Sequence, residues 1–123
     1  MTIFDEQAVF MQACGQTILS DNYEQYLLYR DLMAEEMGEL IEADVKADIV
    51  EQADALIDIL VVTIGAGLSL GLPMDLLWNE VMRSNLAKID PETGTVHKRS
   101  DGKVLKPEGW QPPNIAAILK EQE

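Results

Sequence analysis

One predicted helix, residues 49–70, carries an acidic stripe in its first half and is apolar all round in its second half. This change limits what the chain can fold into. Glu51, Asp54 and Asp58 lie on a stripe about 60° wide if each residue advances the helix by about 100°. From Ile59 to Ile64 the same helix is apolar all round, which predicts that this half is buried. A solvated acidic face should not continue along its own stripe into valines. The acidic residues are therefore expected at the edge of a core.

The preceding helix, predicted from Tyr23 to about Asp44, carries a second acidic set. Glu35, Glu36 and Glu39 form one face beside the apolar side of this helix. A short connection should place the two helices antiparallel, with their acidic sets facing each other. Converging carboxylates repel strongly where water is excluded, so they need a cation. Ligation by oxygen alone, without His or Cys, favours Mg²⁺ or Mn²⁺ over Zn²⁺. The alternative is a solvated acidic surface.

Length and composition predict one globular domain. The chain has 123 residues, 47% of them hydrophobic, which suffices for one core and not for two. Its single cysteine, Cys14, excludes an internal disulfide framework and is expected to pack as a small core residue. No secretory signal pattern begins the sequence, and the longest apolar run is shorter than a membrane span. We therefore expect a cytoplasmic protein without a membrane partner.

Charge is distributed unevenly along the chain. The net charge is −13, which makes binding to a nucleic acid polymer unlikely on electrostatic grounds. Residues 1–82 hold 16 acidic residues against two basic ones, whereas residues 83–123 hold six against seven. An acidic body followed by a more basic tail suits a polyanion bound through a divalent metal. A chance bias in a solvated tail is the alternative.

The rest of the sequence predicts further helices and a tail. The first twenty residues have helical spacing, and a fourth helix should start near Pro73. After Lys88 the signals change to turns, with Asp101-Gly102 placed for a hairpin, and Asn114 is suited to cap a last short helix. The expected fold is all-α, a bundle-like domain of four to five helices over about residues 1–90. An irregular C-terminal arm should occupy about residues 91–123.

Four segments carry a family resemblance. They are "EEMGE" (35–39), "DALIDILVV" (54–62), "EVMRSNLAK" (80–88) and "DGKVLKPEGW" (101–110). In this order they resemble the MazG-like all-α nucleoside triphosphate pyrophosphatase superfamily, in particular its small, phosphoribosyl-ATP pyrophosphohydrolase-like members. The resemblance implies a single MazG-like domain over residues 1–123, and a homodimer or a dimer of dimers.

The resemblance also implies a set of metal ligands. The family pattern EExxE followed by ExxD matches Glu35, Glu36 and Glu39 in its first half, and Asp58 matches the final Asp. The family's second Glu falls on Ala55, so Glu51, Asp54 or both would replace it, with Asp54 preferred. The expected ligands of Mg²⁺, or of Mn²⁺, are Glu35, Glu36, Glu39, Asp54 and Asp58. Glu36 and Glu39 are the expected catalytic residues, with Glu36 accepting a proton from water.

Nucleotide contacts are implied for the basic part of the chain. Arg83, Asn85 and Lys88 lie near the end of the fourth helix, and Lys103 and Lys106 lie in the arm. The alternative for Arg83 and Lys88 is a general preference of cations for helix C-termini.

The function expected from this resemblance is Mg²⁺-dependent hydrolysis of a nucleoside triphosphate, NTP or dNTP, to the monophosphate and pyrophosphate. Its role would be house-cleaning of the nucleotide pool. Two alternatives stay open: phosphoribosyl-ATP pyrophosphohydrolase activity, and a non-catalytic acidic helical interaction module.

Overall fold

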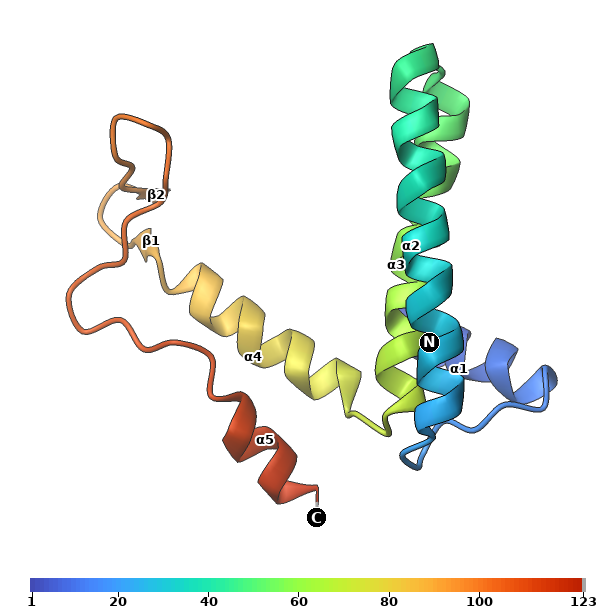
Figure 1. Ribbon diagram of the computed structural model, residues 1–123. Helices are drawn as coiled ribbons and strands as arrows, with labels where there is room; N and C mark the ends of the chain where they lie inside the picture. Colours follow the sequence, from blue (N-terminus) through green and yellow to red (C-terminus); the bar gives the residue numbers. More distant parts are fainter. Residues whose placement is uncertain (123) are drawn as a thin grey trace. The chain divides into compact units, whose positions relative to one another are not determined.

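The computed structural model describes residues 1–122, which form five α-helices and one small two-stranded sheet (Figure 1). The structure is 62% helix, so the all-α prediction is confirmed. The helices are α1 (Ile3–Ala13), α2 (Tyr23–Lys46), α3 (Ile49–Ser69), α4 (Met74–Leu86) and α5 (Ile115–Glu121), and the strands are β1 (Ile89–Asp90) and β2 (Thr95–Val96). The chain divides into two compact units, Met1–Met74 and a second unit from Asp75 onward.

Helix α1 is shorter than the sequence predicts. Thr2 caps its start in a capping box with Asp5, and the helix ends at Ala13. Gly15 then adopts a left-handed conformation with φ of 76°, which stops the helix. The predicted helix over the first twenty residues is therefore too long. Cys14 lies exposed at its end, so its predicted place in the core is also wrong.

Helices α2 and α3 match their predicted bounds to within about two residues, which is the usual precision of helix boundaries. The side chains of Asn22 and Asp48 accept hydrogen bonds from backbone N–H groups in the first turns of α2 and α3. Ala47, with a positive φ of 51°, makes the turn between the two helices. A connection of two residues allows only an antiparallel hairpin.

Cross-helix contacts fix the register of this hairpin. The Tyr29 ring lies against Gly65, whereas Gln52 Nε2 donates a hydrogen bond to Asp44 Oδ1 at 2.9 Å. Residue numbers thus rise along α2 as they fall along α3, and the two helices run side by side in Figure 1. This register brings the middle of α2 beside the middle of α3, where both acidic sets lie.

The core of the first unit lies at the α1 end of the hairpin. Its buried side chains are Met11, Tyr29, Val62, Ile64, Ala66 and Leu68. Phe4, Ile18, Leu32 and Met74 are among the partly buried residues packed around them.

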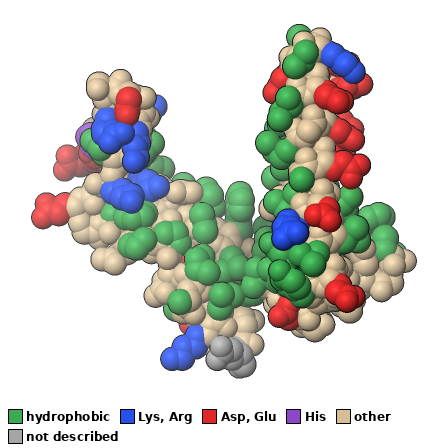
Figure 2. All heavy atoms as spheres, viewed as in Figure 1, with side chains coloured by type: hydrophobic (Ala, Val, Ile, Leu, Met, Phe, Trp, Pro, Cys, Tyr) green, Lys and Arg blue, Asp and Glu red, His purple; other side chains and the backbone are tan. Residues whose placement is uncertain are grey.

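Part of the predicted burial of α3 is wrong. Leu60 is 53% exposed and Val61 is 36% exposed, although Val62 and Ile64 are buried as expected. The physical reason is that α1 and α2 cover only one side of α3. Figure 2 shows hydrophobic side chains along one edge of the α2–α3 hairpin and acidic side chains along the other.

The second unit combines α4 with an irregular but hydrogen-bonded tail. Strands β1 and β2 pair antiparallel, with Ile89 opposite Val96. A second turn joins Lys98 to Val104 and contains Gly102 at φ of 89°, so the predicted hairpin at Asp101-Gly102 is confirmed. Asn114 caps α5 by accepting from Ala117 N–H, also as predicted.

No helix within residues 1–122 is both long enough and apolar enough to cross a membrane.

The close approach at Gly65 yields a first prediction. A Cβ atom at this position would come within 3.0 Å of three atoms of the buried Tyr29 ring. Tyr29 is also held by a hydrogen bond from its hydroxyl to Gln16, so its ring has little room to move. We expect Gly65→Ala to lower the free energy of unfolding by about 1–3 kcal/mol through overpacking, as measured by urea denaturation.

Gly38→Ala is the matched control. Gly38 is exposed on α2, and a Cβ there would meet no atom within 4 Å. This variant should be neutral or more stable by up to about 1 kcal/mol, because alanine is the better helix former. Equal stability of the two variants would contradict the proposed contact between Tyr29 and α3.

Candidate functional site

Glu36 occupies an unusual environment on α2. Its Oε2 atom is buried and has no hydrogen-bond partner within residues 1–122, although the side chain as a whole is half-buried. A carboxylate oxygen in this state has lost water without gaining a donor, which is costly. Such an atom is a place where a cation or a proton would be accommodated.

The surroundings of Glu36 are acidic. Desolvation, a hydrogen bond with Glu39, and repulsion from Glu39, Asp58 and Glu35 raise the pKa of Glu36 from 4.5 to about 7. Asp58, which is half-buried, approaches from α3, and the other two come from α2 itself. The hairpin therefore brings together four of the five predicted metal ligands.

Asp54, the fifth predicted ligand, lies in an adjoining hollow. This hollow has a volume of about 370 Å³ and is lined by Glu39, Glu42, Lys46, Glu51 and Asp54. Glu39 belongs to both groups, so the acidic residues form one continuous strip along the hairpin. Glu42 and Lys46 were not singled out from the sequence, although they continue the helical spacing of Glu35 and Glu39.

Ala55 stands at the position where the resemblance places the family's second Glu. Ala55 is only 3% exposed, on the inner side of α3. Glu51 and Asp54 instead line the same hollow, so the structure provides carboxylates beside the family position rather than at it. Both residues remain candidates for the missing ligand.

These residues fit a hard divalent cation by their chemistry. They offer only oxygen donors, and one of those oxygens is buried without a partner. However, no three Asp, Glu, His or Cys side chains of the described residues are close enough together to hold a metal ion as they stand. Binding would therefore require rotamer changes, for which the exposed Glu35, Glu39 and Asp54 have room.

The predicted substrate-binding residues lie in the second unit, where Figure 2 shows most of the basic side chains. Arg83 pairs with Glu80 at 2.7 Å and donates to the carbonyl oxygens of Gln111 and Pro112. Lys103 is exposed. Through these contacts Arg83 binds the tail at Gln111 and Pro112. Its role in substrate binding stays a prediction.

Asn85, Lys88 and Lys106 are brought together around Trp110. Lys88 Nζ donates to Asn85 Oδ1 at 3.1 Å, and both lysines lie over the Trp110 ring. Trp110 was not among the site residues predicted from the sequence. The available signal was a single aromatic residue closing the lysine-rich segment "KVLKPEGW".

Comparison with known families decides the assignment of the chain. A family model described as Phosphoribosyl-ATP pyrophosphohydrolase matches residues 12–85, which is more than half of the chain. The chain belongs to this family. The phosphoribosyl-ATP pyrophosphohydrolase family lies within the MazG-like superfamily, so the predicted resemblance is confirmed, and membership places the protein among pyrophosphohydrolases. A search of curated proteins found no match.

The family match covers the whole acidic strip on α2 and α3, together with Arg83 and Asn85. Lys88, Lys106 and Trp110 lie beyond its last residue. The acidic hairpin is thus the part of this chain that it has in common with the phosphoribosyl-ATP pyrophosphohydrolase family.

The raised pKa of Glu36 predicts how stability depends on pH in metal-free protein. Between the unfolded pKa of 4.5 and the folded pKa of about 7, the folded state keeps a proton that the unfolded state releases. This contribution to stability is fully present below pH 4.5 and is lost as the pH rises through 7. We expect the melting temperature in chelator to fall between pH 5 and pH 7.5, and to fall less in Glu36→Gln.

Glu24→Gln is the control for this pH series. Glu24 lies on the same helix, in its first turn and away from the acidic strip. This variant should keep the slope of the parent. An unchanged slope in Glu36→Gln would show that Glu36 does not titrate in this range.

Proposed function

We propose that the protein is a Mg²⁺-dependent nucleoside triphosphate pyrophosphohydrolase, which cleaves an NTP or dNTP to the monophosphate and pyrophosphate. The observation that carries this proposal is the buried, unpartnered Oε2 of Glu36, surrounded by three further carboxylates on the hairpin that matches the family. A house-cleaning role in a cytoplasmic nucleotide pool is part of the same proposal.

The acidic strip supplies the ligands in this proposal. Glu36, Glu39 and Asp58 would hold Mg²⁺ or Mn²⁺, with Glu35 and Asp54 completing the set. A bound divalent cation would neutralise charge on the triphosphate. Glu36 would accept the proton of the attacking water as a general base. Glu39 would act beside Glu36 as a second catalytic carboxylate.

The basic side chains of the second unit supply the substrate contacts in this proposal. Lys88 and Lys106 are the leading candidates, because they share the Trp110 ring and, like Lys103, form no ion pair with a carboxylate within residues 1–122. Asn85 and Lys103 are also proposed, and Arg83 would contribute where its contacts with the tail allow.

Two other functions are supported by specific observations. The description of the matching family favours phosphoribosyl-ATP as substrate, with the same metal chemistry. The lack of a ready-made group of three ligands within residues 1–122 favours a non-catalytic acidic module. Pyrophosphate release from a panel of NTPs, dNTPs and phosphoribosyl-ATP with Mg²⁺ separates all three. Release from phosphoribosyl-ATP alone, or from no compound, would overturn the proposal.

Asp58→Asn tests the metal site through both activity and stability. The change is nearly isosteric and removes one charge facing Glu36, so the metal-free variant should melt at or above the parent temperature. Mg²⁺ should raise the melting temperature of the parent clearly and that of the variant little, since a ligand stabilises only the state that binds it. Pyrophosphate release should fall by orders of magnitude.

Asp31→Asn is the matched control, because Asp31 is exposed on the same hairpin and pairs loosely with Arg30 at 3.9 Å. It should keep both activity and the response to Mg²⁺. If Asp58→Asn retains full activity and the parent ignores Mg²⁺ and Mn²⁺, the metal site is wrong.

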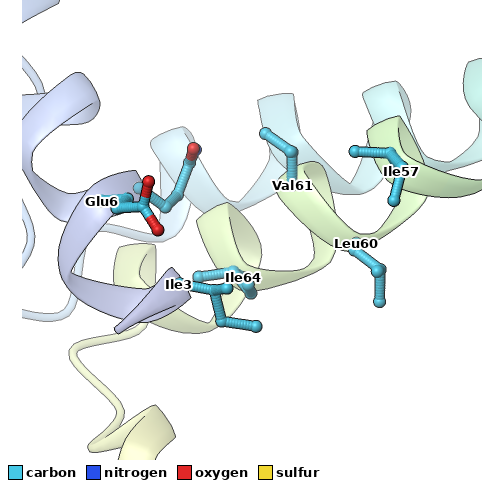
Figure 3. A pocket seen from close by; sticks show the side chains of 7 residues that line it. Ile3, Glu6, Ile57, Leu60, Val61 and Ile64 are labelled. Carbon is cyan, nitrogen blue, oxygen red and sulfur yellow. The ribbon is translucent and has the colours of Figure 1, made fainter. Parts of the chain in front are cut away.

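We also propose that the chain assembles as a homodimer or a dimer of dimers through the apolar side of α3. Leu56, Ile57 and Leu60 are each more than half exposed on this side. Ile57 and Leu60 also line a hollow of about 280 Å³ with Ile3, Val61 and Ile64, shown in Figure 3. A helix this apolar is typical of an interface, and a second copy offers a matching apolar surface.

Light scattering with size-exclusion chromatography tests this assembly. The parent should exceed its monomer mass of 13.7 kDa at micromolar concentration, and Leu60→Asp should shift it towards the monomer. Leu19→Asp is the control, because Leu19 is 89% exposed in the loop after α1. A monomeric parent would refute the proposal.

A further inference from the structure

Trp110 is anchored to the end of α4 in the second unit. Its indole Nε1–H donates a hydrogen bond to the carbonyl oxygen of Ser84 at 2.6 Å, and Ser84 is buried. Lys88 Nζ lies 5.2 Å from the centre of the ring, and Lys106 Nζ lies 4.9 Å from it. One indole ring therefore gathers two ammonium groups from different parts of the chain, through the attraction of cations to an aromatic face.

The charge gathered at this ring is not compensated by the protein. The two arginines of the unit form close pairs with carboxylates, Arg83 with Glu80 and Arg99 with Asp101, and His97 pairs with Asp90 when protonated. No lysine of the unit forms an ion pair with a carboxylate of residues 1–122, and what distinguishes Lys88 and Lys106 is that they share the Trp110 ring. Two positive charges that contact one ring and form no ion pair favour the binding of an anion.

A hollow beside Lys88 gives room for such an anion. Its volume is about 400 Å³, and its lining includes Lys88, His97 and Pro107, the residue after Lys106. Asp90 and Glu108 also line it. Asp90 is hydrogen-bonded to His97 at 2.8 Å, and this bond lowers the pKa of Asp90.

We infer that Trp110 is a positioning residue, which holds Lys88 and Lys106 in place as a site for a pyrophosphate group. Two separate ammonium groups match two neighbouring charged phosphates, and lysine binds phosphate as a point charge. The identity of the substrate rests on the proposed function, whereas the anion site rests on the geometry around the ring. In this role the indole organises cations and does not stack on the nucleobase.

Binding of inorganic pyrophosphate to the full chain, measured by calorimetry with and without Mg²⁺, tests the inference without turnover. The double variant Lys88→Gln/Lys106→Gln should weaken binding by at least about tenfold, the loss expected for charged contacts. Lys98→Gln/Lys120→Gln removes the same charge from the same unit and should weaken it by less than about twofold, since exposed charges act weakly at a distance. Trp110→Leu should weaken binding while both lysines remain, and Trp110→Phe should weaken it less.

A second measurement covers the case in which Trp110→Leu perturbs the fold. The chain has two tryptophans, so in Trp78→Phe the indole fluorescence reports on Trp110 alone. Pyrophosphate should change this fluorescence, and the change should disappear when Lys88 and Lys106 are both replaced by Gln. Absence of the change in Trp78→Phe would overturn the inference.

Binding of a nucleoside monophosphate tests whether the Trp110 ring positions the lysines or stacks on the nucleobase. It should depend little on Trp110, because this ligand has a base and no pyrophosphate. If Trp110→Leu weakens binding of the monophosphate and spares that of pyrophosphate, the ring stacks on the base and the inference fails.

Lysine-dependent binding of pyrophosphate without any triphosphate hydrolysis would support the anion site and refute the proposed function. If triphosphate is hydrolysed but replacing both lysines leaves the affinity for pyrophosphate unchanged, the proposed function would be supported and the anion site refuted.

Discussion

The close packing of α2 against α3 is the interaction on which the candidate site depends. Gly65 allows the Tyr29 ring to lie directly on α3. The small buried side chains of Ala43 and Ala55 allow the two helices to pack closely elsewhere along their contact. Because the turn between the helices has two residues, this contact allows one register only. That register sets Asp58 within electrostatic reach of Glu36.

The same packing creates a conflict inside the metal-free protein. Small residues and apolar contacts hold the hairpin together at its α1 end, while carboxylates repel one another along the middle. A group whose charged form is disfavoured by burial and by like charges is typical of functional sites, where stability is given up for chemistry. The buried oxygen of Glu36 marks the point at which this conflict is greatest.

The sequence predicted the hairpin well because its signals are local. Helix periodicity and the capping residues Asn22 and Asp48 determine where α2 and α3 start. Periodicity shows that a helix is apolar, but not which elements cover it, and so the exposure of Leu60 was not predicted. The contacts of Trp110 were not predicted for a related reason: those with Ser84 and Lys88 join residues more than twenty positions apart, and Trp110 lies in a tail without a periodic pattern.

The uneven charge of the chain would give the two proposed sites different requirements for metal. Residues 1–82 carry 16 acidic residues against two basic ones, so they would repel a bare triphosphate. A triphosphate can approach the acidic strip only when divalent cations accompany it or are already bound there. The ammonium groups around Trp110 need no such help, because they already present positive charge. If the proposed function holds, binding of a polyphosphate at the acidic strip should therefore require metal, whereas binding of an anion at the lysines around Trp110 should not.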